Sequence, residues 1–294
     1  MYLEEMDYFR PETVPELLAL LKEYGSDARI LAGGTDLILQ MKLKMKKADC
    51  LIDVKGIEAF KAVEETEEAF TVGCGVSLTA LWQSQTVKEH FPALWDSINV
   101  HADRQIRNRG TLIGNLCNAS PAADTTAPLL TYSARVTIQS ENKTKEVDLA
   151  SFFTGPGKTI LEAGELVTDV RIPKPPKVSF CAFQKLGRVY DDIAIVNASA
   201  RLEFSEDGRC ASASIYMGAV GPVVRRAPKA EELLVGERLT EELIQAATNT
   251  AREESSPITD ARASAEYRKH TIGVLVERAL KDIQEQHSQS GIEV

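Results

Sequence analysis

Two glycine-bearing stretches stand out in this chain, Ala32-Gly33-Gly34-Thr35-Asp36-Leu37 and Gly110-Thr111-Leu112-Ile113-Gly114-Asn115. We interpret each as a loop that follows an apolar, strand-like run and offers backbone N–H groups with no cationic side chain inside the turn. Peptide N–H groups in tight turns form concave anion sites, and glycine lets the backbone come close to a phosphate. The pair predicts that a dinucleotide diphosphate is held from both sides, although either loop alone is more typical of an ordinary turn.

The residues that follow the second loop favour a bound ligand. Asn115-Leu116-Cys117-Asn118-Ala119-Ser120-Pro121-Ala122-Ala123-Asp124 is rich in small residues and short polar side chains. Asn, Ser and Asp can hydrogen-bond phosphate, ribityl and ribose oxygens, while Ala leaves room for the ligand. The chain has neither a Gly-x-Gly-x-x-Gly turn opening a βαβ unit nor a Gly-x-x-x-x-Gly-Lys-Ser/Thr loop, so the usual single-loop solutions do not apply.

Together these stretches resemble the flavin signatures of one family, the FAD-binding medium subunits of molybdenum hydroxylases such as xanthine dehydrogenase and carbon monoxide dehydrogenase. The first signature matches residues 31–37 and the second matches residues 107–124; further matches lie at residues 152–159, 182–188, 192–196 and 264–268. One position departs from the pattern, because Ile113 stands where the family usually has glycine. An isoleucine side chain there would crowd a diphosphate.

The resemblance implies an α+β fold with three parts. A two-subdomain FAD-binding fold of the vanillyl-alcohol-oxidase/PCMH type would occupy residues 1–57 and 58–175. A C-terminal domain with a three-stranded antiparallel sheet and helices would occupy residues 176–294. The run Pro173-Lys174-Pro175-Pro176 supports the second boundary, because it can continue neither a ladder nor a helix.

Hydrophobic periodicity and turn residues predict the elements of this fold. We expect helices over residues 13–24, 35–44, 78–85, 91–100, 241–253 and 263–286. We expect strands over residues 28–32, 50–54, 69–73, 135–139, 166–172, 179–185, 193–204 and 210–220. The polar tail from His287 to Val294 is predicted to fray.

The resemblance also assigns cofactor-binding residues. The first loop would wrap the diphosphate, with Asp36 turned toward backbone donors because its carboxylate would repel a phosphate. Asp124 would lie near the sugar portions, and His101 would be a noncovalent neighbour of the flavin. The full set is Leu31, Ala32, Gly33, Gly34, Thr35, Asp36, Leu37, His101, Ala102, Gly110, Thr111, Gly114, Asn115, Asn118, Asp124, Leu166, Val167 and Lys185, with Leu166 and Val167 covering the adenine end.

Three residues are candidates for a role in the redox chemistry. Lys185 falls on the strand that the resemblance places beside the isoalloxazine ring, where a cation would stabilise the reduced, anionic flavin. An exposed strand lysine is an equally good interpretation. Asp191 and Asp192 follow Arg188 in a loop at the open face of the flavin, where carboxylates would tune the access of an electron acceptor. Exposed turn acids are the alternative for both.

Composition limits the partners and the location. The chain has 34 Lys and Arg against 43 Asp and Glu, and this net charge of −9 argues against a nucleic-acid partner. Lys42, Lys44, Lys46 and Lys47 alternate with Met41, Leu43 and Met45, which predicts a solvated basic face over a buried apolar one. No apolar run approaches the ~20 residues of a membrane span, and the N-terminus lacks the features of a signal peptide, so we expect a soluble, cytoplasmic protein.

Five cysteines and four histidines show no ligand spacing, so we expect no metal in this chain. The resemblance implies an electron-transfer subunit that binds FAD. A large subunit with a molybdenum cofactor and a small subunit with two [2Fe–2S] clusters would supply electrons, and NAD⁺ or another acceptor would take them. Two alternatives stay open: a self-sufficient FAD-dependent oxidase or dehydrogenase, and a scaffold subunit that has lost the flavin.

Overall fold

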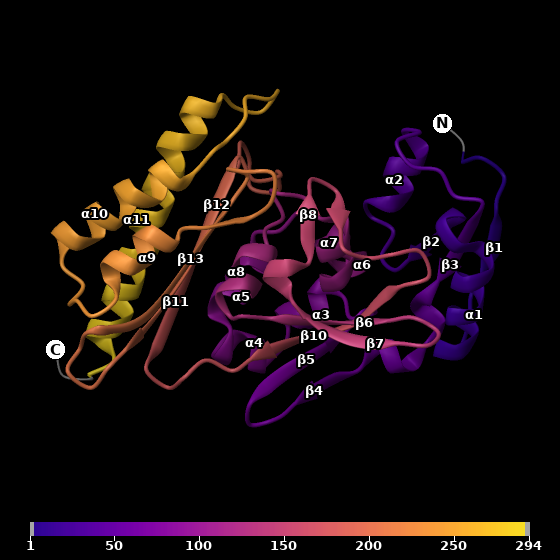
Figure 1. The fold of residues 1–294 in the computed structure, drawn as a ribbon, viewed down its shortest axis with the longest axis horizontal. Helices are drawn as coiled ribbons and strands as arrows, with labels where there is room; N and C mark the ends of the chain where they lie inside the picture. Colours follow the sequence, from indigo (N-terminus) through magenta and orange to yellow (C-terminus); the bar gives the residue numbers. More distant parts are fainter. Residues whose placement is uncertain (1–2, 292–294) are drawn as a thin grey trace. The chain divides into compact units, whose positions relative to one another are not determined.

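The computed structural model describes residues 3–291, which form two compact units that interleave along the sequence (Figure 1). Within the described chain, unit 1 comprises residues 3–83, 103–118 and 134–173, and unit 2 comprises residues 84–102, 119–133 and 174–291. Their helices and strands confirm the predicted α+β organisation. The division into residues 1–57, 58–175 and 176–294 stays a prediction.

Unit 1 contains two sheets and a small hairpin. The first sheet is parallel, in the order β1-β3-β2, and is formed by β1 (Asp7–Phe9), β2 (Ala28–Leu31) and β3 (Cys50–Asp53). The second is antiparallel, in the order β4-β5-β10-β6-β7, and is formed by β4 (Val63–Glu65), β5 (Ala69–Gly73), β6 (Arg135–Gln139), β7 (Thr144–Asp148) and β10 (Leu166–Pro173). The hairpin pairs β8 (Phe153–Gly155) with β9 (Lys158–Thr159).

The helices of unit 1 are short. Its first, α1 (Val14–Tyr24), begins where the Thr13 side chain accepts a hydrogen bond from the Glu16 N–H, and ends at Gly25, whose φ of 51° is left-handed. The others are α2 (Leu37–Lys42), α3 (Leu78–Trp82), α6 (Arg104–Arg109) and α7 (Leu112–Asn118). The strand–helix–strand block predicted over residues 28–54 is confirmed as β2, α2 and β3, with β2 and β3 parallel.

Unit 2 is an antiparallel sheet between two layers of helices (Figure 1). Its strands, in the order β11-β12-β13-β14, are β11 (Ser179–Leu186), β12 (Val196–Phe204), β13 (Cys210–Gly218) and β14 (Arg225–Arg226). The predicted three-stranded meander is therefore confirmed and extended by one short strand. One layer contains α9 (Pro228–Leu234), α10 (Glu241–Glu254) and α11 (Ala265–Gln289); α5 (Pro92–Asn99) and α8 (Thr126–Thr131) form the other, with α4 (Gln85–His90) beside α5.

Three expectations about the elements were wrong. The second glycine loop follows helix α6 rather than a strand-like run, and most of it forms the start of helix α7. The helix expected over residues 78–85 ends at Trp82, because Ser84 caps the separate helix α4. His287 is not frayed: α11 continues to Gln289, and residues 292–294 of the predicted tail lie outside the described residues.

His287 lies in the core of unit 2 and makes its stability dependent on pH. Its ring stacks on Phe204 with centroids 3.9 Å apart, it is 6% exposed, and its Nε2 has no hydrogen-bond partner among residues 3–291. Burial lowers the pKa of His287 below its ordinary value of 6.5. The unfolded chain therefore takes up the proton first as the pH falls, and this favours unfolding.

We predict that the free energy of unfolding of unit 2 decreases as the pH falls through about 6.5. His287→Phe keeps the ring stack and should remove this contribution. Urea denaturation at about pH 7.5 and pH 5.5, on either side of the unperturbed histidine pKa, would measure it. An equal loss of stability between the two pH values in the wild type and in His287→Phe would contradict the prediction.

Candidate functional site

The first glycine loop is a concave turn of backbone N–H groups. It connects β2 to α2 and contains Gly34, whose φ of 78° is the left-handed conformation that favours glycine. The N–H groups of Gly33, Gly34 and Thr35 donate no hydrogen bond within residues 3–291. Consecutive unpaired N–H groups around a left-handed residue form an anion-binding concavity.

Asp36 differs from its expected orientation. It precedes the first residue of α2, but its side chain makes no capping hydrogen bond to the helix and is exposed. The expectation that this carboxylate turns toward backbone donors was therefore wrong. Leu37 begins α2, and Leu31 ends β2 opposite Asp53.

The second loop is fixed by hydrogen bonds to its neighbours in unit 1. The Gly110 N–H donates to the Ile106 carbonyl at 2.7 Å, and the Gly110 carbonyl accepts from the Leu78 N–H at 2.9 Å. The Thr111 hydroxyl accepts from the Gly114 N–H at 3.0 Å. A Cβ at Gly114 would lie 2.8 Å from this hydroxyl oxygen, so any larger residue at that position would displace the Thr111 side chain.

Ile113 does not protrude from the loop. Its side chain is 4% exposed and is therefore packed in the protein interior. The side chain that departs from the family pattern does not lie on an open surface of the second loop. The expected crowding of a diphosphate by Ile113 thus has no support in this structure.

The two glycine loops are in direct contact. A Cβ at Gly33 would lie 2.7 Å from the carbonyl carbon of Arg109 and 2.9 Å from the Cα of Gly110, distances that real Cβ atoms do not show. On the other side of the contact, a Cβ at Gly110 would lie 3.7 Å from the Thr35 hydroxyl oxygen. The loops that the sequence paired are therefore adjacent within unit 1.

Polar and apolar positions beyond the loops extend this arrangement. Asn118, at the end of α7, accepts a hydrogen bond from Gln40 Nε2 at 2.9 Å, while the buried Gln40 Oε1 has no partner in the described chain. Leu166 and Val167, at the start of β10, are 1% and 4% exposed. Because both side chains are buried, a ligand would meet the backbone at these two positions.

In unit 2, Lys185 and His101 both contact Asp124. Lys185 Nζ donates to Asp124 Oδ2 at 2.9 Å and to the Val100 carbonyl at 2.8 Å, and His101 Nδ1 lies 3.0 Å from the same Oδ2. The side chains of Lys185 and Asp124 are 6% and 5% exposed, which rules out the interpretation of Lys185 as an exposed strand lysine. Asp124 Oδ1 is buried and has no hydrogen-bond partner among residues 3–291. Ala102, the residue after His101, has a φ of 47°.

The two aspartates of the β11–β12 loop differ in their environment. Asp192 Oδ2 accepts from Arg188 Nε at 2.6 Å, and this guanidinium holds the pKa of Asp192 below its usual value. The carboxylate of Asp192 is thus bound within its own loop. Asp191 is exposed, so its charge is presented to solvent.

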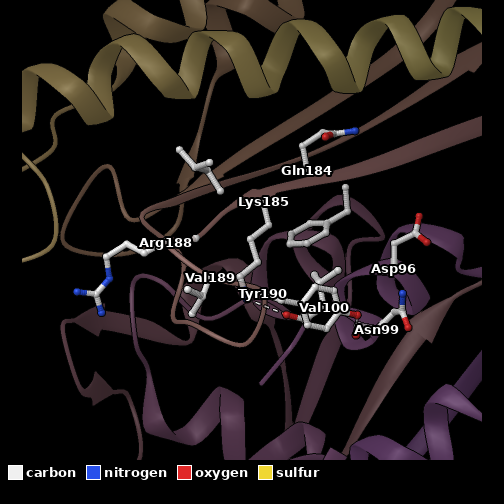
Figure 2. Close-up of a pocket in the computed structure, with 11 residues that line it drawn as sticks. Asp96, Asn99, Val100, Gln184, Lys185, Arg188, Val189 and Tyr190 are labelled. Carbon is white, nitrogen blue, oxygen red and sulfur yellow. Dashed lines mark hydrogen bonds between the residues drawn. The ribbon is translucent and has the colours of Figure 1, made fainter. Parts of the chain in front are cut away.

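A cavity of about 550 Å³ in unit 2 has Lys185 in its lining (Figure 2). The Tyr190 hydroxyl donates to the Asn99 carbonyl at 3.1 Å and joins the loop to α5. Asp96 also lines this cavity. Desolvation by the surrounding protein raises the pKa of its carboxyl group, and the negative charge of Asp282 raises it further. Sequence reasoning missed Asp96, Asn99 and Tyr190, because no motif marks their helix or their loop.

Other chemistry is limited in the described chain. Burial raises the pKa of the Cys117 thiol to about 12, so this cysteine of the second signature is held as a neutral thiol. No group of three or more His, Cys, Asp and Glu side chains among residues 3–291 is arranged to hold a metal ion. None of the described helices is long and apolar enough to cross a membrane.

The residues present fit a flavin dinucleotide on two observations. The first loop offers unpaired N–H groups of the kind that receive a diphosphate, and it is held against the second loop by the Gly33–Arg109 contact. Asp124 Oδ1 is a buried hydrogen-bond acceptor without a donor in the described chain. A hydroxyl of a sugar or ribityl chain could donate to it.

Two family models cover nearly all of the chain. Residues 4–175 match the FAD binding domain in molybdopterin dehydrogenase, and residues 181–283 match the CO dehydrogenase flavoprotein C-terminal domain. The resemblance seen in the flavin signatures is confirmed by these matches. The first match alone spans more than half of the chain and assigns it to this family.

Named relatives agree with this assignment. The 6-hydroxypseudooxynicotine dehydrogenase complex subunit alpha of Paenarthrobacter nicotinovorans is 30% identical over 93% of each chain. The carbon monoxide dehydrogenase medium chain of Hydrogenophaga pseudoflava is 31% identical over 93% of this chain and 95% of its own. A solved structure of carbon monoxide dehydrogenase from the same organism matches with a TM-score of 0.93 and 30% identity, over 97% of this chain and 99% of that one. The chain therefore belongs to the flavoprotein family of molybdopterin dehydrogenases, which are oxidoreductases, and carries the FAD-binding domain followed by the C-terminal domain of that family.

Proposed function

We propose that this chain is the FAD-binding electron-transfer subunit of a multi-subunit molybdenum hydroxylase. It would receive electrons from the [2Fe–2S] clusters of a small subunit, which are reduced in turn by a large molybdenum-binding subunit. It would pass them to NAD⁺ or another acceptor. Relatives named as the medium chain of carbon monoxide dehydrogenase and as the FAD-binding subunit of xanthine dehydrogenase support this assignment.

The contact between the two glycine loops carries the proposal. The bound flavin would supply one- and two-electron redox chemistry. The N–H groups of Gly33, Gly34 and Thr35 would bind the diphosphate without a cation, and Thr111, Gly114, Asn115 and Asn118 would bind from the second loop. A scaffold that had lost the flavin would have no need of three adjacent unpaired donors.

The buried cluster of unit 2 would orient the cofactor and set its charge. Asp124 Oδ1 would accept from a sugar or ribityl hydroxyl, while Oδ2 holds Lys185 in place. The Lys185 ammonium would offset negative charge at the reduced ring system, because a buried cation acts strongly in a low-dielectric site. His101 would keep the Asp124 carboxylate in position through its 3.0 Å contact.

The direct test is to purify the chain with its native partners and measure flavin, iron and molybdenum. We expect about one FAD for each chain, and reduction of this flavin when the substrate of the partner subunit is added. Purified chain that contains FAD and oxidises a substrate without iron or molybdenum would show the self-sufficient enzyme instead. Colourless chain that cannot take up FAD would show the scaffold.

Asp191 provides a test of acceptor access. We predict that Asp191→Ala changes the rate of acceptor reduction severalfold and leaves the FAD content unchanged, because the exposed carboxylate acts on an approaching charged acceptor. Steady-state rates at low and high salt would measure the effect, which should diminish at high salt. Glu206→Ala, in the exposed turn between β12 and β13, removes the same charge and serves as the control. Identical acceptor kinetics in the two variants would refute the role of Asp191.

A further inference from the structure

A surface of unit 1 combines lysines with exposed apolar side chains. It lies on α2 and the residues that follow it, and we call it the lysine patch: Leu39, Lys42, Leu43, Lys44, Met45, Lys46 and Lys47. Leu39 is 54% exposed, Leu43 is 49% exposed and Met45 is 72% exposed. The sequence predicted that Leu43 and Met45 would face a buried layer with Met41, but only Met41 is buried. That prediction was wrong, and three large apolar side chains lie among four cations.

The lysine patch is held in shape by its own backbone. The Met45 and Lys46 N–H groups both donate to the Gln40 carbonyl, at 2.8 Å and 3.3 Å. Lys44 adopts a φ of 58°, a left-handed conformation that costs an ordinary residue about 1–2 kcal/mol. Met41 anchors the segment on a small core with Ala48 and Leu51. These hydrogen bonds turn the chain back after α2 and leave the side chains of Leu43 and Met45 exposed to solvent. Burial of both side chains would be favourable.

This surface adjoins the glycine loops. Helix α2 begins directly after the first loop, and Gln40 Nε2 is hydrogen-bonded to Asn118 at the end of α7. A partner on the lysine patch would therefore lie next to the loops that we propose for the diphosphate.

The charge of the lysine patch contrasts with that of the chain. The chain carries a net charge of −9, but residues 37–47 contain four lysines and no acid. Lys42, Lys44 and Lys46 form no ion pair within residues 3–291, and Lys47 reaches only Glu4, at 4.0 Å. An unpaired basic surface with exposed apolar residues is complementary to an acidic surface that carries apolar pockets.

We propose that the lysine patch is the docking surface for the iron–sulfur subunit, which would present an acidic and partly apolar face to it. This inference rests on the proposed function, since an electron donor must bind close to the flavin that it reduces. A membrane fits less well, because amphipathic membrane helices are much longer than the six residues of α2. A second copy of this acidic chain is the remaining competitor.

The test measures the affinity of the full-length FAD-loaded chain for the isolated iron–sulfur subunit of its own complex. The charge-reversal variant is Lys42→Glu with Lys44→Glu and Lys46→Glu. The matched control is Lys143→Glu with Lys177→Glu and Lys229→Glu, three exposed lysines elsewhere that give the same change in net charge. We expect Kd to rise at least about tenfold for the first variant and to stay within about twofold for the control. FAD content and thermal unfolding should match the wild type in both.

Further measurements separate docking of the iron–sulfur subunit from the other possible occupants of the lysine patch. Wild-type Kd should rise with ionic strength, and Met45→Ser should weaken binding at high salt, where charge contributes least. Unchanged affinity of the charge-reversal variant, or a salt-independent wild-type Kd should that variant fail to fold, would overturn the docking surface. So would lysine-dependent binding to phosphatidylserine vesicles, or lysine-dependent dimerisation, with no effect on the subunit. If the wild type carries FAD but binds no iron–sulfur subunit, the proposed function itself fails.

Discussion

Replacing Gly33 with alanine is expected to reduce the FAD content of the purified chain at least about tenfold. The added methyl group would be pressed against the backbone of Arg109 and Gly110, at 2.7 Å from one carbonyl carbon and 2.9 Å from one Cα. Backbone atoms cannot rotate away as a side chain can, so the two loops must move apart. Unpaired N–H groups that were aligned for a diphosphate would lose that alignment. Flavin absorbance per chain after gel filtration measures the result.

Gly155→Ala is the matched control for this substitution. Gly155 lies in β8 of the same unit, and a Cβ there would meet nothing within 4 Å. We expect it to keep its full flavin content. Circular dichroism on both variants would separate loss of the cofactor from loss of the fold. Gly33→Ala with wild-type FAD content and wild-type affinity would show that contact between the loops is not needed for binding.

The second large effect is expected from Lys185→Met. Lys185 and Asp124 are almost fully buried, and Nζ lies 2.9 Å from Oδ2. Removal of the ammonium leaves the Asp124 carboxylate buried without its cation, and its Oδ1 already lacks a hydrogen-bond partner in the described chain. Breaking a buried ion pair in this way lowers the free energy of unfolding by about 3–5 kcal/mol. We expect a lower free energy of unfolding of unit 2 and weaker FAD binding. Urea denaturation of the FAD-free variant isolates the first of these effects.

A double variant distinguishes the effect of the unpaired Asp124 charge from the loss of Lys185 packing. Lys185→Met with Asp124→Asn removes both charges, so it should regain part of the stability that Lys185→Met loses. Lys281→Met breaks partly exposed ion pairs with Glu241 and Glu277 and should have a much smaller effect. Equal stability losses in the single and double variants would show that the buried charge is not the cause.

Much of unit 1 could be predicted because its signals are local. Gly33 and Gly34 mark a turn after an apolar strand, and the pattern of apolar residues predicts β2, β3 and β5 within a residue or two. The three long strands of unit 2 are predicted within three residues at each end. The flavin signatures of the family then connected the two loops, which periodicity alone cannot do. Their contact through Gly33 and Arg109 fits that pairing.

What could not be predicted depends on contacts between distant residues. Lys185 could be exposed or buried on the strand pattern alone, and only its contacts with Asp124 and the Val100 carbonyl decide the question. His287 was assigned to a frayed tail because its neighbours in sequence are polar, whereas its stacking partner Phe204 is 83 positions away. The alternation of lysines with apolar residues predicted that Met45 is buried. Its N–H instead donates to the Gln40 carbonyl, which turns the chain back and leaves the Met45 side chain exposed.

The interleaving of the two units bears on how this protein can be dissected. Helices α5 and α8 come from residues before 134, yet they pack on strands that begin at Ser179. A fragment that stops near residue 175 would expose their apolar sides, and the remaining fragment would lose one cover of its sheet. We therefore expect neither half to be soluble by itself. Chimaeras with relatives should exchange residues 84–102 and 119–133 along with the C-terminal portion.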